Sequence, residues 1–159
     1  IWGKIWQMPT VQWTRGDVIT GEARTGWDVM RFEAAPESFI FEATITIESG
    51  VAAGLAVRLS EEMAGAVVAL DAEEQAVAYY DAPAFDFAEK RRTPIAVGAA
   101  IHLRLVNRLE HLEVYVNDEL RLAFSRYRGI GGNVGLFADR SQARFQRIRL
   151  RELDVNRSE

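Results

Sequence analysis

The chain of 159 residues contains no cysteine and carries a formal net charge of −4 at pH 7. A chain of this length suits a single domain that buries roughly 70% of its unfolded surface, so it needs no disulfide or metal ion to fold. The absence of cysteine excludes thiol catalysis and thiolate metal sites, and the negative charge disfavours nucleic acid as a partner.

The distribution of apolar residues indicates how the chain is divided. The longest apolar run, residues 64–70, is too short to cross a bilayer, so a membrane is not an expected partner. The chain opens on Ile1 with no recognisable signal peptide, which favours a processed or excised piece. We therefore expect a docking segment or linker remnant over residues 1–12, containing Trp2 and Trp6, one domain over 13–153, and a tail over 154–159.

Alternation of apolar and polar residues predicts a series of short strands. The clearest is 39–48, where every second residue is apolar; a turn at Ser49-Gly50 then leads to a strand at 54–59. Residues 66–80 are predicted to form a hairpin, and 81–98 a loop whose basic run, 90–92, is exposed to solvent. Further strands are predicted at 18–20, 27–32, 101–107, 112–117, 119–124, 133–138 and 145–153.

About a dozen short strands separated by turn residues, without any long helical pattern, predict an all-β fold. The economical arrangement is an antiparallel sandwich of two sheets. The pair Asn117-Asp118 is typical of a tight hairpin turn within this arrangement.

Three charged residues occupy the outward positions of the first three well-patterned strands. These are Glu42, Arg58 and Asp71. If the strands form a meander, the two carboxylates and the guanidinium lie side by side on one open sheet face. The group would then be either a ligand site or a cross-strand ion network, since opposite charges on neighbouring strands attract.

The sequence contains no other cluster that indicates a specific chemistry. The glycine-rich turn at 129–135 lacks the G-x-G-x-x-G spacing and precedes a strand, so it does not predict a phosphate site. The two histidines, His102 and His111, are expected at the surface. No segment marks the deep pocket that a pair of glycosidase carboxylates needs, and enzyme activity is not expected.

The order of the strand motifs resembles that of the C-terminal β-sandwich of glycoside hydrolase family 32 (invertases, inulinases and levanases), and of the related fructan-binding modules of family 66. The segments that carry the resemblance are 39–47, 54–58, 67–71, 101–106, 112–119, 132–137 and 143–153.

The resemblance implies a concanavalin A-like jelly roll without catalytic residues of its own, because the catalytic carboxylates of family 32 lie on a separate β-propeller domain. It implies that a terminal fructose or β-fructan such as levan or inulin is bound by Glu42, Arg58 and Asp71, with Tyr79, Tyr80 and Phe137 as the aromatic residues nearby. It implies no cofactor, although many such sandwiches carry a structural calcium ion. The expected partners are carbohydrate and a catalytic β-propeller domain of the parent chain, and the expected location is extracellular.

Two functions are consistent with this sequence. The chain is either a carbohydrate-binding module accessory to a glycoside hydrolase, or a structural or oligomerisation domain of a family 32 enzyme that does not touch sugar. The isolated chain binds fructan only in the first case.

Overall fold

The structure is a computed structural model that describes residues 11–14, 18–62, 64–126 and 132–153. The described residues form ten strands and no helix, so the expectation of an all-β protein is confirmed. Accordingly, they include no helix long and apolar enough to cross a membrane. Residues 1–10 of the expected docking segment, with Trp2 and Trp6, residues 129–131 of the glycine-rich turn, and the tail lie outside the described residues, whereas residues 11 and 12 belong to the first strand.

The strands follow one another along the chain without intervening helices. Their bounds are β1 Val11–Thr14, β2 Ile19–Ala34, β3 Ser38–Leu59, β4 Gly65–Asp71, β5 Ala76–Ala82, β6 Ala88–Arg92, β7 Ala100–Arg108, β8 His111–Val116, β9 Glu119–Ser125 and β10 Asn133–Glu152.

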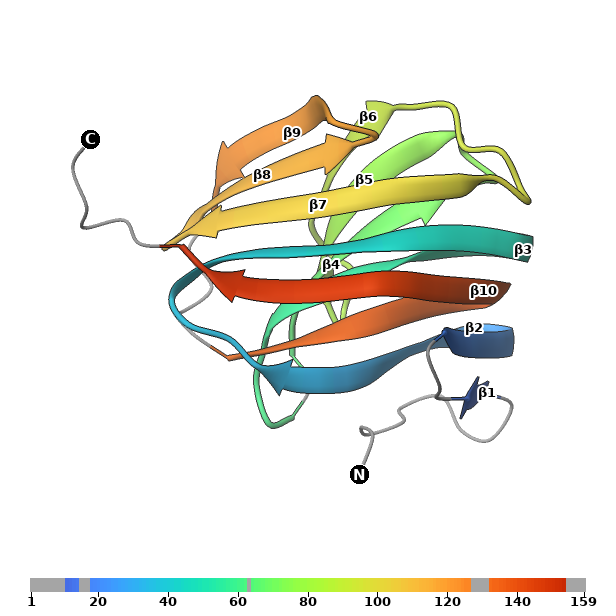
Figure 1. Ribbon diagram of the computed structural model, residues 1–159, viewed down its shortest axis with the longest axis horizontal. Coiled ribbons are helices and arrows are strands. Elements are labelled where there is room, and N and C mark those ends of the chain that lie inside the picture. Colours follow the sequence, from blue (N-terminus) through green and yellow to red (C-terminus); the bar gives the residue numbers. More distant parts are fainter. Residues whose placement is uncertain (1–10, 15–17, 63, 127–131, 154–159) are drawn as a thin grey trace.

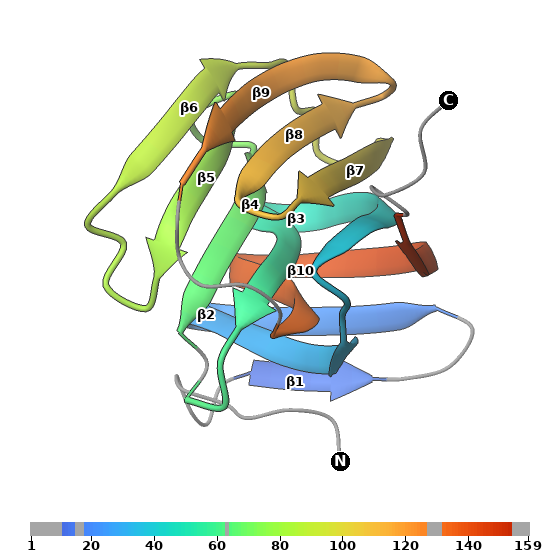
Figure 2. The same cartoon turned by 90° about the vertical axis from the view of Figure 1, so that its left-hand side faces the viewer.

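The strands form an antiparallel β-sandwich of two layers, as predicted (Figures 1 and 2). We call the first layer the β7 layer. In it, β7 pairs with the first half of β3, and β8 and β9 follow in order. We call the second layer the β4 layer. In it, β4 pairs with the second half of β3, and β5 and β6 follow in order. The long strands β2, β3 and β10 run through both layers, and β10 lies between the other two.

The long strands correct the sequence prediction, which divided each of them into two. Residues 49–50 are not a hairpin turn but the point at which β3 bends from one layer into the other. Gly50 permits this bend, because its φ is +102° and a Cβ atom there would lie 2.1 Å from the carbonyl oxygen of Arg140. Strand 39–48 is therefore not a meander neighbour of strands 54–59 and 66–71; it pairs with β7 and β10.

The main core lies between the two layers. Along each strand, alternate residues point into it. Phe39, Phe41 and Ile45 of β3 pack there with side chains of β4, β5, β7 and β8. Burial of these residues is the dominant stabilising contribution, at about 1.5–3 kcal/mol for each large apolar side chain.

Local turn predictions have mixed outcomes. The hairpin at 66–80 is confirmed as β4 and β5, and Asn117 and Asp118 form the turn between β8 and β9 with φ values of +50° and +69°. The prediction of a loop over 81–98 is wrong in part, since Ala88–Arg92 pairs with β5 as an edge strand. The basic run 90–92 is exposed, as expected, but on that strand.

Candidate functional site

The three charged residues that the sequence places on one face do not meet. Glu42 lies on the outer face of the β7 layer, where its Oε1 is 2.7 Å from Nε2 of His102. Asp71 lies on the opposite side of the sandwich, at the end of β4. The Arg58 guanidinium bonds neither of them, so these three side chains are not neighbours in the structure.

Arg58 is buried because the backbone reverses the alternation of β3 at this position. Its φ is +56°, and the register with β10 shifts between residues 133 and 135. A β-bulge of this kind redirects the side chains that follow it. Arg58 therefore turns inward, while Leu59 joins the apolar cluster on the outer face of the β4 layer.

The buried guanidinium is satisfied by uncharged partners. Its Nε and Nη2 donate to Oδ1 of Asn107 at 3.1 and 2.6 Å, and Nη1 donates to the carbonyl oxygen of Arg126 at 2.9 Å. Burial lowers the pKa of Arg58 from its ordinary value. Arg58 is thus a structural residue at one end of the sandwich.

Tyr79 is also inside the core, where it is completely buried. Its hydroxyl donates to Oδ1 of Asp81 at 3.0 Å, and Nε of Arg126 donates to Oδ2 of the same carboxylate at 3.0 Å. Burial, followed by the bond to Asp81, raises the pKa of Tyr79 to about 12. Tyr79 therefore cannot contact a ligand at the surface.

The other three predicted residues, Asp71, Tyr80 and Phe137, are brought together on the outer face of the β4 layer. They line a cavity of about 180 Å³, which we call the aromatic pocket. Its complete lining is Ala52, Ala69, Asp71, Glu73, Glu74, Tyr80, Phe85, Phe137, Asp139 and Arg140.

The pocket exists because small residues occupy the middle of this sheet face. Strand register places Val29, Phe137, Gly54, Ala69, Ala78 and Lys90 in one row, and Trp27, Asp139, Ala52, Asp71, Ala76 and Arg92 in the next. Alanine and glycine at the centre leave a floor close to the backbone, while larger side chains at both ends form the walls.

An aromatic cluster forms one wall. Phe85, in the loop between β5 and β6, has its ring centroid 4.8 Å from that of Trp27 and 5.5 Å from that of Tyr80, both in edge-on arrangements. Trp27 also lies 6.3 Å from Phe137. Such contacts stabilise each pair by about 0.5–1.5 kcal/mol beyond burial, so the wall is fixed before any ligand arrives.

Charged groups form the rim of the pocket. Oδ1 of Asp71 accepts the backbone N–H groups of Glu73 and Glu74 at 2.9 and 2.8 Å, which fixes its carboxylate at the turn. Oδ2 of Asp71 has no hydrogen-bond partner among the described residues, and it is not one of their fully buried unpaired atoms. This oxygen is therefore available to a ligand.

The two cations near the rim are each held by a carboxylate. Nε and Nη2 of Arg140 donate to Asp139 at 3.0 and 3.1 Å, and Nζ of Lys90 donates to Glu74 at 2.8 Å. These bonds raise the pKa values of Arg140 and Lys90, while burial raises the pKa of Tyr80. Four lining carboxylates against these two cations give the rim a net negative charge.

The sequence interpretation missed Trp27, Phe85, Asp139 and Arg140. One signal was present: the outward positions of 52–56 and 76–78 are alanine or glycine, which is unusual for a strand face exposed to water. Among the described residues, no three His, Asp or Glu side chains are arranged to hold a metal ion.

Comparison with known proteins identifies the fold. No protein-family model matches the chain, and no curated protein matches it. The carbohydrate-binding module CBM66 from Bacillus subtilis superposes with a TM-score of 0.81 over 89% of this chain and 92% of its own, at 22% identity. A Bacillus subtilis protein of unknown function with a galectin-like fold superposes with a TM-score of 0.70 over 90% and 86%, at 12% identity.

Enzymes share the architecture as well. An alginate lyase of polysaccharide lyase family 7 superposes with a TM-score of 0.61 over 87% of this chain and 79% of its own, at 10% identity. At these identities the comparisons establish the jelly-roll fold alone.

Proposed function

We propose that the protein is a non-catalytic carbohydrate-binding module whose ligand is a β-fructan or a terminal fructoside, bound in the aromatic pocket. The observation that carries this proposal is one sheet face on which a floor of small residues is enclosed by aromatic rings and by carboxylates. The likeness to the B. subtilis module CBM66 in fold supports it.

The chemistry of the pocket suits a fructose unit. A furanose ring presents neighbouring hydroxyl groups and little flat apolar surface, so hydrogen bonds to charged groups stabilise it more than stacking does. The free Oδ2 of Asp71 can accept from a sugar hydroxyl, while Tyr80 and Phe85 supply apolar contact with the ring carbons. Of the six residues that the sequence suggested, the proposed site uses Asp71, Tyr80 and Phe137.

Two carboxylates at the rim already accept hydrogen bonds within the protein, which favours a role in binding over one in catalysis. Asp71 holds its turn through two backbone bonds, and Asp139 is paired with Arg140. We propose that the module works outside the cell as an accessory to a glycoside hydrolase, with a catalytic β-propeller domain as its partner in the parent chain.

Isothermal titration calorimetry with fructose, inulin and levan tests the proposal. Tyr80→Ala and Asp71→Asn are the informative variants; the asparagine keeps an Oδ1 acceptor for the two backbone N–H groups but removes the charge. Loss of one hydrogen bond to a charged group costs about 1.5–3 kcal/mol, so we expect Asp71→Asn to weaken binding about 10- to 100-fold.

Matched controls come from the opposite layer. Tyr115→Ala removes a tyrosine, and Asp118→Asn a carboxylate, from positions outside the pocket; both are expected to bind as the wild type does. Absence of binding to all three ligands, or unaltered affinity in both pocket variants, overturns the proposal. A purely structural domain would bind none of the three ligands, and its removal would destabilise the parent enzyme. A domain with enzyme activity would hydrolyse a fructoside.

A further inference from the structure

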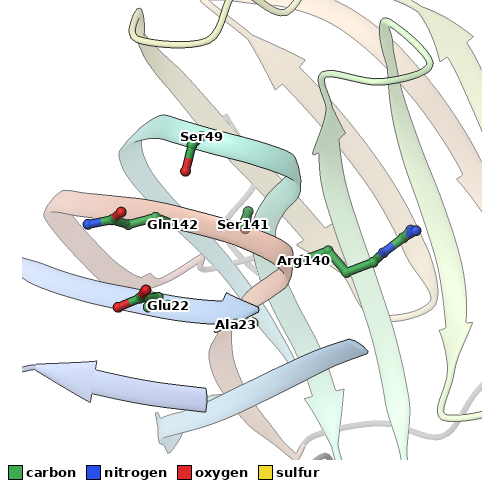
Figure 3. A pocket seen from close by; sticks show the side chains of 6 residues that line it. All are labelled: Glu22, Ala23, Ser49, Arg140, Ser141 and Gln142. Atoms are coloured by element: carbon green, nitrogen blue, oxygen red, sulfur yellow. The ribbon is translucent and has the colours of Figure 1, made fainter. Parts of the chain in front are cut away.

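A second cavity lies beside the aromatic pocket at the bend of the long strands. It has a volume of about 250 Å³ and is lined by Glu22, Ala23, Ser49, Arg140, Ser141 and Gln142 (Figure 3). We call it the crease pocket. Arg140 lines both cavities, so the two are neighbours. Figure 3 shows the Arg140 side chain directed away from Glu22 and Gln142.

The backbone produces the crease. Gly50 of β3 pairs with Ser141 of β10 and lies close to the carbonyl oxygen of Arg140. Gly50 and Arg140 both have positive φ, +102° and +44°. The register of β10 shifts between 139 and 141 against β2, and between 142 and 143 against β3. Irregularities of this type bend a strand sharply. The cavity is therefore part of the fold's geometry and does not depend on the rotamer of one long side chain.

Three polar side chains lie in a row across this bend. Gln142 is the cross-strand partner of Glu22 on one side and of Ser49 on the other, and Figure 3 shows the amide of Gln142 and the carboxylate of Glu22 directed the same way. Gln142 supplies an amide with both donor and acceptor atoms, and Ser49 supplies a hydroxyl, beside the carboxylate of Glu22.

This set fits a neutral polyhydroxyl ligand better than other classes. The single cation, Arg140, is already paired with Asp139 through two hydrogen bonds, so the crease offers no free charge to a phosphate or a uronic acid. The lining contains no aromatic ring and only one small apolar side chain, Ala23, so it offers little to an apolar ligand. The planar amide of Gln142, which can both donate and accept, suits the paired hydroxyls of a sugar.

We propose that the crease pocket is a second sugar subsite, so that two consecutive units of one neutral oligosaccharide lie in the aromatic pocket and the crease pocket, on either side of Arg140. This inference rests on the proposed function of the aromatic pocket. Each cavity is smaller than the roughly 300–1,000 Å³ typical of pockets for drug-sized ligands, which is consistent with one ring in each.

The test compares fructose with fructose-containing di- and trisaccharides by calorimetry. In the wild type we expect the oligosaccharides to bind about tenfold more tightly than fructose, the equivalent of one or two additional net hydrogen bonds. Gln142→Ala should remove this gain and leave the affinity for fructose unchanged. Gln146→Ala, on the same strand but outside the crease lining, is the matched control and should retain the gain.

The outcomes separate this inference from the proposal on which it rests. Equal affinity for fructose and its oligomers in the wild type, or a gain that persists in Gln142→Ala, overturns the second subsite alone. Absence of any binding by the wild type overturns both. Full binding of fructose and of the oligosaccharides in both Tyr80→Ala and Asp71→Asn overturns the aromatic pocket and, with it, the arrangement of two sugar units proposed here.

Discussion

The buried hydroxyl of Tyr79 predicts a loss of stability at alkaline pH. The ring lies in the core, with its centroid 4.8 Å from that of Phe124, and the hydroxyl donates to Asp81. Ionisation would place a phenolate against this carboxylate in a site closed to water. The pKa of Tyr79 is accordingly raised to about 12, first by burial and then by the bond to Asp81.

The sign and size follow from the two pKa values. An unfolded tyrosine ionises near pH 10, whereas Tyr79 in the folded protein ionises near 12. The stabilisation is therefore fully present below pH 10 and is lost as the pH rises from about 10 to 12. A shift of about two units corresponds to about 2.7 kcal/mol in total, of which about 2 kcal/mol is lost by about pH 11.5.

Urea unfolding of the wild type and of Tyr79→Phe measures this loss. At about pH 9 the phenylalanine variant should be less stable by about 1 kcal/mol, because it lacks the hydrogen bond to Asp81. Between about pH 9 and 11.5 the wild type should lose about 2 kcal/mol more than the variant does. The other ionisable groups are common to both proteins, so parallel decline of the two curves would refute this account of Tyr79.

Two further predictions concern stability. Gly50→Ala should destabilise the protein by about 2 kcal/mol or more and disturb the crease, because it adds a Cβ at 2.1 Å from a carbonyl oxygen at a φ of +102°. Gly98→Ala has a similar φ of +90° but nothing within 4 Å, so in urea unfolding it should cost less; equal losses would contradict the role of the contact. Asn107→Ala should cost about 2–4 kcal/mol by leaving the buried Arg58 without its side-chain partner, whereas Arg108→Ala, at an exposed position, should change unfolding by less than about 0.5 kcal/mol. A small effect of Asn107→Ala would show that Arg58 finds another acceptor.

Alternation of apolar and polar residues was sufficient to predict the fold class. It located the strand segments of β3, the hairpin of β4 and β5, and the turn at Asn117, because these features depend on neighbouring residues in the sequence. It did not show that residues 39–59 form one continuous strand. Serine and glycine are typical of a bend within a strand as well as of a hairpin turn. At Gly50 the bend depends on the close approach of the Arg140 carbonyl, which is distant in the sequence.

Half of the six residues that the sequence suggested lie together in the structure. Asp71, Tyr80 and Phe137 lie in the aromatic pocket, since ordinary alternation holds at these positions of β4, β5 and β10. Arg58 was misplaced because a single residue with positive φ reverses the alternation. Glu42 was misplaced for a different reason: its outward direction was right, but strand order, which periodicity does not reveal, put it on the other layer.

The position of β10 also affects how the protein forms during synthesis. Strands β2 and β3 do not pair with each other; the last strand of the described chain lies between them and joins both along much of its length. Neither layer can be completed until residues 133–152 have left the ribosome, and until then the edges and apolar faces of β2 and β3 lack their partner. Folding of the sandwich is therefore expected to be cooperative and to be completed only after β10 has emerged.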